Sequence, residues 1–141
     1  QCKSFFWGLW AEQQAWLDQK LAASTATWKI VVTHFPCGFQ AGYWRSLRAK
    51  YGVDLLVTGH RHDQELYANS GMLGGMTCFV TGGGGGITSE ATPGPDHSQW
   101  YGEAQYGFYD LTIKRDKMHI ESINWDGTIA ASTTIYPARR R

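Results

Sequence analysis

The chain has 141 residues, which is enough for one modest domain with an apolar core of its own. Its 13 basic and 12 acidic residues leave a net charge of +1, so composition gives no argument for nucleic acid or an anionic membrane as a partner. No apolar run approaches the roughly 18 residues of a membrane-spanning helix, so we expect no membrane insertion.

The first half of the chain predicts helices alternating with strands. Side chains recur at helical spacing from Trp10 to Leu21, and β-branched residues dominate the two apolar runs that follow. Gly52 has the residue type and position of a C-terminal helix cap. The expected elements are a helix over residues 10–23, a strand over 28–33, a loop over 35–38, a helix over 41–51 and a strand over 53–57. This β-α-β order implies a parallel sheet with a right-handed crossover.

The second half of the chain predicts an antiparallel meander. Apolar and polar residues alternate between Phe108 and Ile113, and Arg115-Asp116 and Asp126-Gly127 have the composition of hairpin turns. The expected strands cover residues 64–67, 76–80, 106–113, 118–123 and 128–135. Residues 82–102 are rich in Gly and Pro without periodicity, and we expect a long functional loop there. The fold class is therefore α/β (α+β), with residues 1–141 forming one domain.

Three histidines follow predicted strands. His34 stands at the tip of the strand over 28–33, and His60 and His62 follow the strand over 53–57. Side chains two residues apart point the same way on extended backbone. In a tight turn, the same spacing can direct two side chains toward two different metal ions. Imidazole is a common metal ligand, so this arrangement indicates a metal site at the rim of a sheet. The alternative is a pair of surface histidines in a loop and an unrelated third.

Three stretches carry a family resemblance. They are Val31-Val-Thr-His-Phe-Pro36, Val53-Asp-Leu-Leu-Val-Thr-Gly-His-Arg-His62 and Val80-Thr-Gly-Gly-Gly-Gly-Gly-Ile-Thr-Ser-Glu90. Together they resemble the C-terminal half of a calcineurin-like metallophosphoesterase, and the purple acid phosphatases within that family. The resemblance implies a two-sheet β-sandwich flanked by helices, of which this chain is the later half. It also implies hydrolysis of phosphate esters by water that a dinuclear metal centre activates.

The resemblance also assigns residues to the metal centre. His34 and His60 would ligate one ion and His62 the other, and the two ions would be transition metals such as Fe, Zn or Mn. The residues that would surround the ligands or line the cleft are Gly59, Asp63, Gly82 and Gly83. A carboxylate at Asp63 would orient a histidine, and the alternative for it is a solvated charge.

The chain departs from the family pattern in its missing N-terminal blocks. Asp-x-His, Gly-Asp-x-x-Asp (or Tyr) and Gly-Asn-His are absent, and in the family they supply the bridging carboxylate and the remaining ligands. Three imidazoles do not build two such sites, so the chain alone is predicted to be inactive. Its expected partners are an N-terminal half or another polypeptide that completes the fold, and a phosphate ester. The alternative is a catalytically inactive subunit with a structural role in a larger complex.

The cysteines and the termini give weaker indications. Cys2, Cys37 and Cys78 permit at most one internal disulfide, so neither the pairing nor the compartment follows from the sequence. We expect a small buried thiol at Cys37 rather than a nucleophile. The chain contains no targeting segment and opens on Gln1, so we expect a piece processed from a longer product.

The remaining histidines and aromatic residues complete the candidates. His97 and His119 are expected to be exposed, and Trp44 is expected in the core. Seven Trp among the aromatic residues favour an aromatic core or interface. Glycan binding through Trp100 and Tyr101 is a third class of function, which rests on composition alone.

Overall fold

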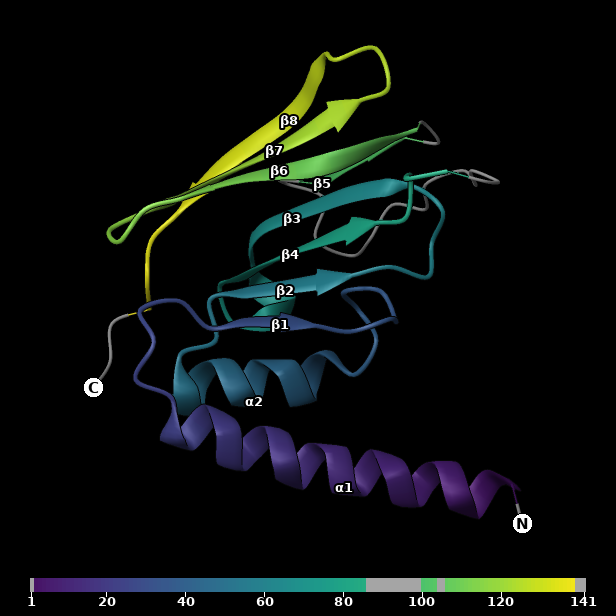
Figure 1. Cartoon of the computed structure of the whole chain (residues 1–141), viewed down its shortest axis with the longest axis vertical. Coiled ribbons are helices and arrows are strands. Elements are labelled where there is room, and N and C mark those ends of the chain that lie inside the picture. The colour runs from purple at the N-terminus through teal and green to yellow at the C-terminus, as the bar shows by residue number, and fades with distance from the viewer. Residues whose placement is uncertain (1, 86–99, 104–105, 139–141) are drawn as a thin grey trace.

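The computed structural model describes residues 2–85, 100–103 and 106–138, which form two β-sheets with the helices on one side (Figure 1). Within these residues the first sheet has the strand order β1-β2-β4-β3-β5 and the second has the order β6-β7-β8. The first sheet contains β1 (Ile30–Val32), β2 (Leu55–Thr58), β3 (Gln64–Ser70), β4 (Met76–Thr81) and β5 (Trp100–Glu103). The second contains β6 (Gly107–Ile113), β7 (Met118–Asn124) and β8 (Ile129–Ile135). The helices are α1 (Cys2–Ala23), α2 (Ala41–Tyr51) and the short 3₁₀ helix η1 (Gly71–Leu73).

The first sheet is built around the predicted β-α-β unit. Strands β1 and β2 pair in parallel, with α2 between them in the chain, and β4 joins β2 in parallel on its other side. Strand β3 then pairs antiparallel with both β4 and β5. Because β2 and β4 occupy the middle of this order, β1 is left at one edge. The carboxyl ends of β1 and β2 therefore lie side by side, at the place where both candidate histidine segments begin.

The second sheet confirms the predicted meander in part. Strands β6, β7 and β8 pair antiparallel in sequence order, with one irregularity in register between Ser122 and Ile123. The predicted strands at 64–67 and 76–80 do not join this meander, because they pair within the first sheet. Of the predicted loop over 82–102, residues 86–99 lie outside the described residues, and Trp100 to Gly102 belong to β5.

The helices differ in how well the sequence located them. Helix α2 spans the predicted residues 41–51, and the left-handed Gly52 ends it by donating its N–H to the carbonyl of Arg48. Helix α1 begins at Cys2 rather than at the predicted Trp10. The large apolar residues before Trp10 crowd together between Phe5 and Leu9, so they do not mark a single face at helical spacing.

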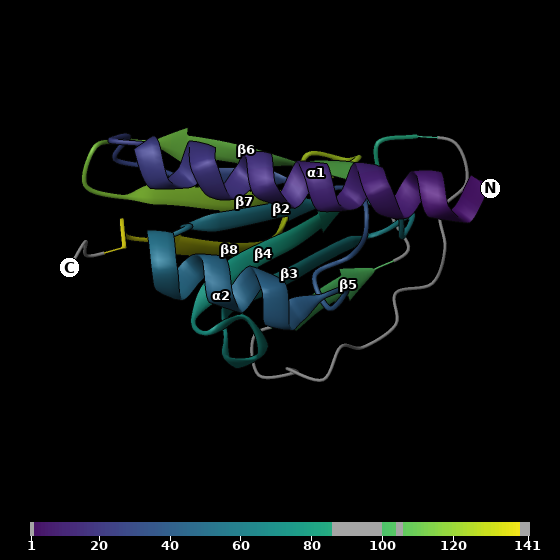
Figure 2. The same ribbon diagram turned by 90° about the horizontal axis from the view of Figure 1, so that it is seen from below.

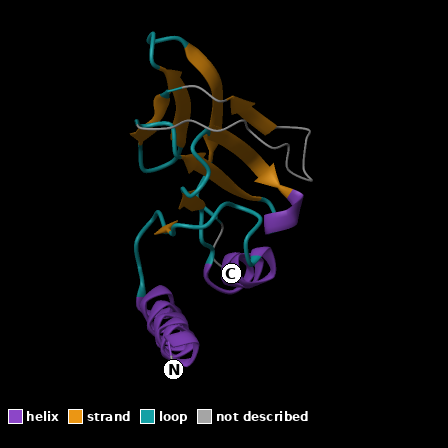
Figure 3. Ribbon diagram, turned by 90° about the vertical axis from the view of Figure 1, so that its right-hand side faces the viewer, coloured by secondary structure: helices purple, strands orange, loops and turns teal. Residues whose placement is uncertain are grey.

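The core lies on both faces of the first sheet. On one face, Trp44 and Leu47 of α2 pack with Val31, Leu56 and other buried side chains, and Figure 2 shows α1 beside α2 on that side. On the other face, the two sheets pack together, as Figure 3 shows from the side; the buried residues there are Leu55, Leu66, Phe79, Met118, Ile120 and Ile135. Strands β2 and β4 are therefore covered on both faces of the sheet, by the helices and by the second sheet, which fixes the position of their carboxyl ends.

The side of the molecule at α1 is less well covered. Its exposed apolar side chains are Phe5, Phe6, Trp7, Leu9 and Trp16. Strand β1 also exposes Ile30 and Val32, the latter at 74%. Among the described helices, none combines the length and the apolar character that a bilayer crossing requires.

Candidate metal centre

Two of the three candidate ligands meet at the strand ends. His34 follows β1 and His60 follows β2, and because these strands are parallel neighbours both side chains leave the sheet at one edge. The Nε2 atom of His34 lies 3.1 Å from the Nδ1 atom of His60, and both residues are exposed. One nitrogen carries the proton that the two rings share. The side chains of His34 and His60 are therefore in contact at the strand ends.

The backbone of the two segments holds the pair. The N–H of Gly59 donates to the carbonyl of His34 at 3.1 Å, and the N–H of Thr33 donates to Val57 at 2.9 Å. His60 itself has φ of 71°, in the left-handed region that side chains other than Gly seldom adopt. Such a conformation costs about 1–2 kcal/mol. The surrounding packing must therefore stabilise the turn that presents His60.

The loop that begins at Gly82 and Gly83 supplies part of the packing around the His60 turn. The N–H of Gly82 donates to the carbonyl of Asp63 at 2.9 Å, and a Cβ added at Gly82 would overlap the carbonyl oxygen of Arg61. Gly83 is buried, and its carbonyl accepts from the N–H of Gly107 at 2.9 Å. Only a residue without a side chain at position 82 allows the backbone to approach Arg61 this closely. The backbone at Gly82 therefore packs directly against the backbone of Arg61 and His62.

His62 does not join the pair formed by His34 and His60. It is exposed, and in the described part of the chain no three His, Cys, Asp or Glu side chains come together as a group suited to a metal ion. Of the other histidines, His97 lies outside the described residues. His119 lies on the second sheet, with 41% of its side chain exposed and its Nδ1 atom 2.9 Å from the hydroxyl of Thr134.

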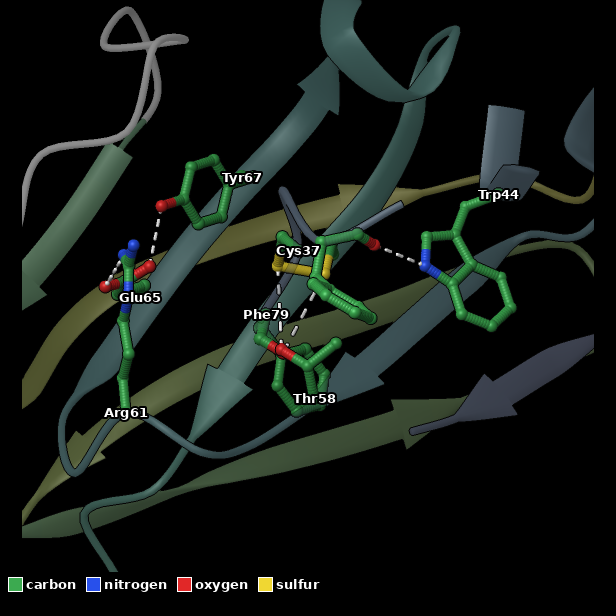
Figure 4. Close-up of a disulfide and its surroundings, with 9 residues drawn as sticks. Cys37, Trp44, Thr58, Arg61, Glu65, Tyr67 and Phe79 are labelled. Atoms are coloured by element: carbon green, nitrogen blue, oxygen red, sulfur yellow. Dashed lines mark hydrogen bonds and ion pairs between the residues drawn. A yellow bond between two sulfur atoms is a disulfide. The ribbon is translucent and has the colours of Figure 1, made fainter. Parts of the chain in front are cut away.

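A buried carboxylate network underlies the turn, and the sequence did not predict it. Glu65 is fully buried, and its carboxylate accepts from Arg61 at 2.7 Å and from the hydroxyl of Tyr67 at 2.6 Å (Figure 4). Burial, and then the hydrogen bond to Glu65, raise the pKa of Tyr67. The spacing offered one signal, because Glu65 and Tyr67 are two apart in a strand and so share a face.

Asp63 is not the solvated charge that the sequence offered as an alternative. It is fully buried, and neither of its carboxyl oxygens has a hydrogen-bond partner among the described residues. Burial, and then the negative charge of Glu65, raise the pKa of Asp63 to about 6. The guanidinium of Arg61 acts in the opposite direction. Arg61 is thus the cation that faces two buried carboxyl groups beneath the histidine turn.

Aromatic rings continue the site toward α1. The centre of the Phe35 ring lies 5.3 Å from the centre of the His34 ring and 5.2 Å from that of the His60 ring. The centre of the Phe39 ring lies 4.5 Å from that of Phe35. Beyond them is an apolar groove of about 250 Å³, whose lining residues include Phe6, Trp7, Trp10, Phe35, Phe39 and Trp44. Trp44 is buried, as predicted. The side chains of Trp100 and Tyr101 lie outside what the structure describes.

Cys37 is not a thiol. It forms a disulfide with Cys78, and both residues are almost completely buried. The expectation of a small buried thiol at Cys37 was therefore wrong in chemistry and right in burial. Three cysteines allow several pairings, and only the position of β4 beside the loop after β1 selects this one.

The two-sheet fold is similar to that of a purple acid phosphatase, in agreement with the resemblance in the sequence motifs. No protein-family model matches the chain, and no curated protein matches it.

The solved structures with a similar fold include the following two. A purple acid phosphatase isolated from seeds of yellow lupin (Lupinus luteus) matches with a TM-score of 0.69 and 22% identity, over 89% of this chain and 28% of the phosphatase. GAP50, described as the anchor in the inner membrane complex of Plasmodium, matches with a TM-score of 0.70 and 19% identity, over 92% of this chain and 44% of GAP50. The chain spans less than half the length of either protein.

Proposed function

We propose that this chain is the C-terminal part of a dinuclear-metal phosphoesterase that hydrolyses phosphate esters. The observation that carries the proposal is the contact between His34 and His60, 3.1 Å apart at neighbouring strand ends. When bound, the metal ions of such a centre activate water for attack on phosphorus. The work of this chain is to hold imidazole ligands at one edge of a rigid sheet.

The side chains present fit part of that centre and not the whole of it. Imidazole nitrogens suit Fe, Zn and Mn, and a cation in place of the shared proton would meet both His34 and His60. No third ligand joins them among the described residues. We assign the second ion to His62, and the remaining ligands to a part of the fold that this chain does not contain.

The exposed edge of the first sheet is where that missing part would bind. Strand β1 pairs only with β2 in the described residues, and it exposes Val32 at 74% and Ile30 at 38%. A groove of about 200 Å³ separates β1 from α1, and Trp16 and Leu17 are among its lining residues. Unpaired edges and apolar surface favour association with another strand. A polypeptide that added a strand to β1 would also reach the end where His34 lies.

The experiment combines metal content with one substitution in the complete assembly. We expect about two transition-metal ions per copy in native material, measured by elemental mass spectrometry, as a dinuclear centre requires. The variant His60→Ala is expected to lower phosphatase activity by at least about 100-fold, since loss of residues outside the ligand set alone costs about 10–100-fold. His119→Ala is the matched control, because His119 lies on the second sheet beside Thr134. Equal activity in the two variants would end the proposal.

The second candidate is a catalytically inactive subunit with a structural or interaction role. The likeness to GAP50, described as an anchor, favours it, as does the apolar surface formed by α1 and β1. It predicts native material without transition metal. It also predicts that His60→Ala leaves assembly unchanged, whereas Val32→Lys, on the exposed edge, weakens it. Metal content therefore separates the two candidates before any activity is measured.

A further inference from the structure

The segment that carries His34 is held to the sheet by a covalent bond. Residues 33–40 connect β1 to α2, and Cys37 within them is bonded to Cys78 of β4 (Figure 4). The two cysteines are 1% and 0% exposed. The disulfide is therefore inside the molecule, three residues along the chain from a candidate metal ligand.

Other attachments of this segment are few. Among the described backbone hydrogen bonds, the N–H of Thr33 donates to the carbonyl of Val57 and the carbonyl of His34 accepts from Gly59, both at the start of the segment, and the N–H of Phe39 donates to Pro36 within the segment itself. The indole N–H of Trp44 donates to the carbonyl of Phe39 at 2.9 Å, at the far end. The side chains of His34 and Phe35 are exposed, and the Phe35 ring lies against both His34 and His60 rather than against the buried core. The disulfide is thus the attachment to the middle of the sheet between Pro36 and Phe39.

The far side of the bond is well fixed. Cys78 pairs in register with Leu56 of β2 and with Tyr67 of β3, so it lies between two strands. The Sγ atom of Cys37 also lies 3.7 Å from the hydroxyl of Thr58, which donates to the carbonyl of Phe79 at 2.9 Å. Thr58 is the last residue of β2, just before the turn that presents His60. One buried point therefore joins the His34 segment to the end of β2 and to β4, in addition to the backbone hydrogen bonds of Thr33 and Gly59.

We propose that the Cys37–Cys78 disulfide positions His34 against His60, so that metal binding by this pair depends on the bond being formed. The metal part of this inference rests on the proposed function, and the positioning part does not. A protein that needs this bond works in an oxidising compartment. The two cysteines are positioning residues, because they touch neither metal nor substrate.

Hydrogen exchange on the full chain tests the positioning. The reporter is the N–H of Gly59, whose acceptor is the carbonyl of His34. In the oxidised chain, we expect it to exchange no faster than the amides of β7. In Cys37→Ala/Cys78→Ala, its exchange should accelerate at least about tenfold more than that of β7, because a local opening adds to the global one. Ile120→Ala is the control, since it destabilises a buried core position by a comparable amount.

Two outcomes would overturn the positioning. One is exchange of the Gly59 amide by local opening in the unaltered chain, in which the disulfide is intact. This outcome can be observed even if the cysteine variant fails to fold. The other is an acceleration at Gly59 that Ile120→Ala reproduces, because global instability would then explain it.

Metal affinity tests the consequence separately. Titration of the full chain with Zn²⁺ alone is expected to show about tenfold weaker binding in Cys37→Ala/Cys78→Ala than in the unaltered chain. The reason is that imidazoles that are mobile before binding must lose conformational freedom when they bind the ion. Binding by Ile120→Ala is expected to be unchanged. Equal Zn²⁺ affinity in the cysteine variant and the unaltered chain would overturn the dependence on the bond. Failure of the proposed function would appear differently, as native assembly without metal and exchange behaviour that still follows the disulfide.

Discussion

The middle and the edge of the first sheet differ in how completely this chain covers them. In the middle, Leu55 and Leu56 of β2 are fully buried, one against the second sheet and the other against the helices. At the edge, β1 buries only Val31 of its three residues. A fully buried Leu contributes about 1.5–3 kcal/mol, so burial stabilises the middle of the sheet more than the edge. The edge strand leaves apolar surface exposed.

The candidate metal centre lies on the boundary between these two regions. His60 follows a middle strand, and its turn is packed by Gly82 and by the network around Glu65. His34 follows the edge strand, and the Cys37–Cys78 disulfide ties its segment to the middle. The segment of His60 is therefore held by packing, and that of His34 by backbone hydrogen bonds and a covalent bond.

The largest expected effect comes from breaking the disulfide. Cys37→Ala/Cys78→Ala opens a loop with a sequence separation of 41 residues, and chain entropy then costs about 4 kcal/mol of the free energy of unfolding. Denaturant unfolding followed by circular dichroism measures this loss. Because the second sheet shares a buried core with the first, the pairing of β6, β7 and β8 should unfold together with the rest rather than earlier.

The control for this measurement is chemical reduction of the unaltered chain under denaturing conditions, followed by refolding with reductant present. It should give the same midpoint as the double variant. A variant that lost less than about 1 kcal/mol would contradict the prediction, and it would mean that the unfolded chain is already compact around the two cysteines.

A smaller loss is expected from a side chain at Gly82. A Cβ there overlaps the carbonyl oxygen of Arg61, so Gly82→Ala must push the histidine turn away, at a cost of about 2 kcal/mol. Gly84→Ala is the matched control, because a Cβ at Gly84 meets nothing within 4 Å. Thermal unfolding compares the two variants. Equal melting temperatures would show that the loop does not pack on the turn.

Regular elements and strand-end histidines were predictable from the sequence. Helix α2 and the three strands of the second sheet carry their own periodicity and turn residues, so local pattern was sufficient. His34 and His60 were predicted together because both follow strands of one β-α-β unit, and parallel strands end at one edge. This inference needs no side-chain detail.

What the sequence could not give depends on contacts between distant segments. A short apolar run does not say which strands flank it, so β4 was assigned to the meander rather than between β2 and β3. Because the position of β4 did not follow from the sequence, the disulfide partner of Cys37 did not follow either. The sequence did not decide between the two alternatives for Asp63 and did not predict the burial of Glu65, because both depend on where Arg61 and Tyr67 lie in the folded turn.

The smallest effects are expected at the edge, where two neighbouring valines face opposite sides of β1. Val31 is 7% exposed and Val32 is 74% exposed. Val31→Ala should lower the free energy of unfolding by about 1.5 kcal/mol, as loss of buried methyl groups does. Val32→Ala should change it by less than about 0.5 kcal/mol, the usual range for exposed positions. Denaturant unfolding of both variants in dilute solution measures the difference.

The outcome at Val32 decides whether the edge is open in the isolated chain. If Val32→Ala costs as much as Val31→Ala, a second copy covers the edge, and sedimentation should show a dimer that Val32→Lys dissociates. If Val32→Ala is silent in the isolated chain and harmful in the complete assembly, the edge binds another part of that assembly. The second result is the one expected, because a strand added to β1 would bring the missing ligands to the end of the sheet where His34 lies.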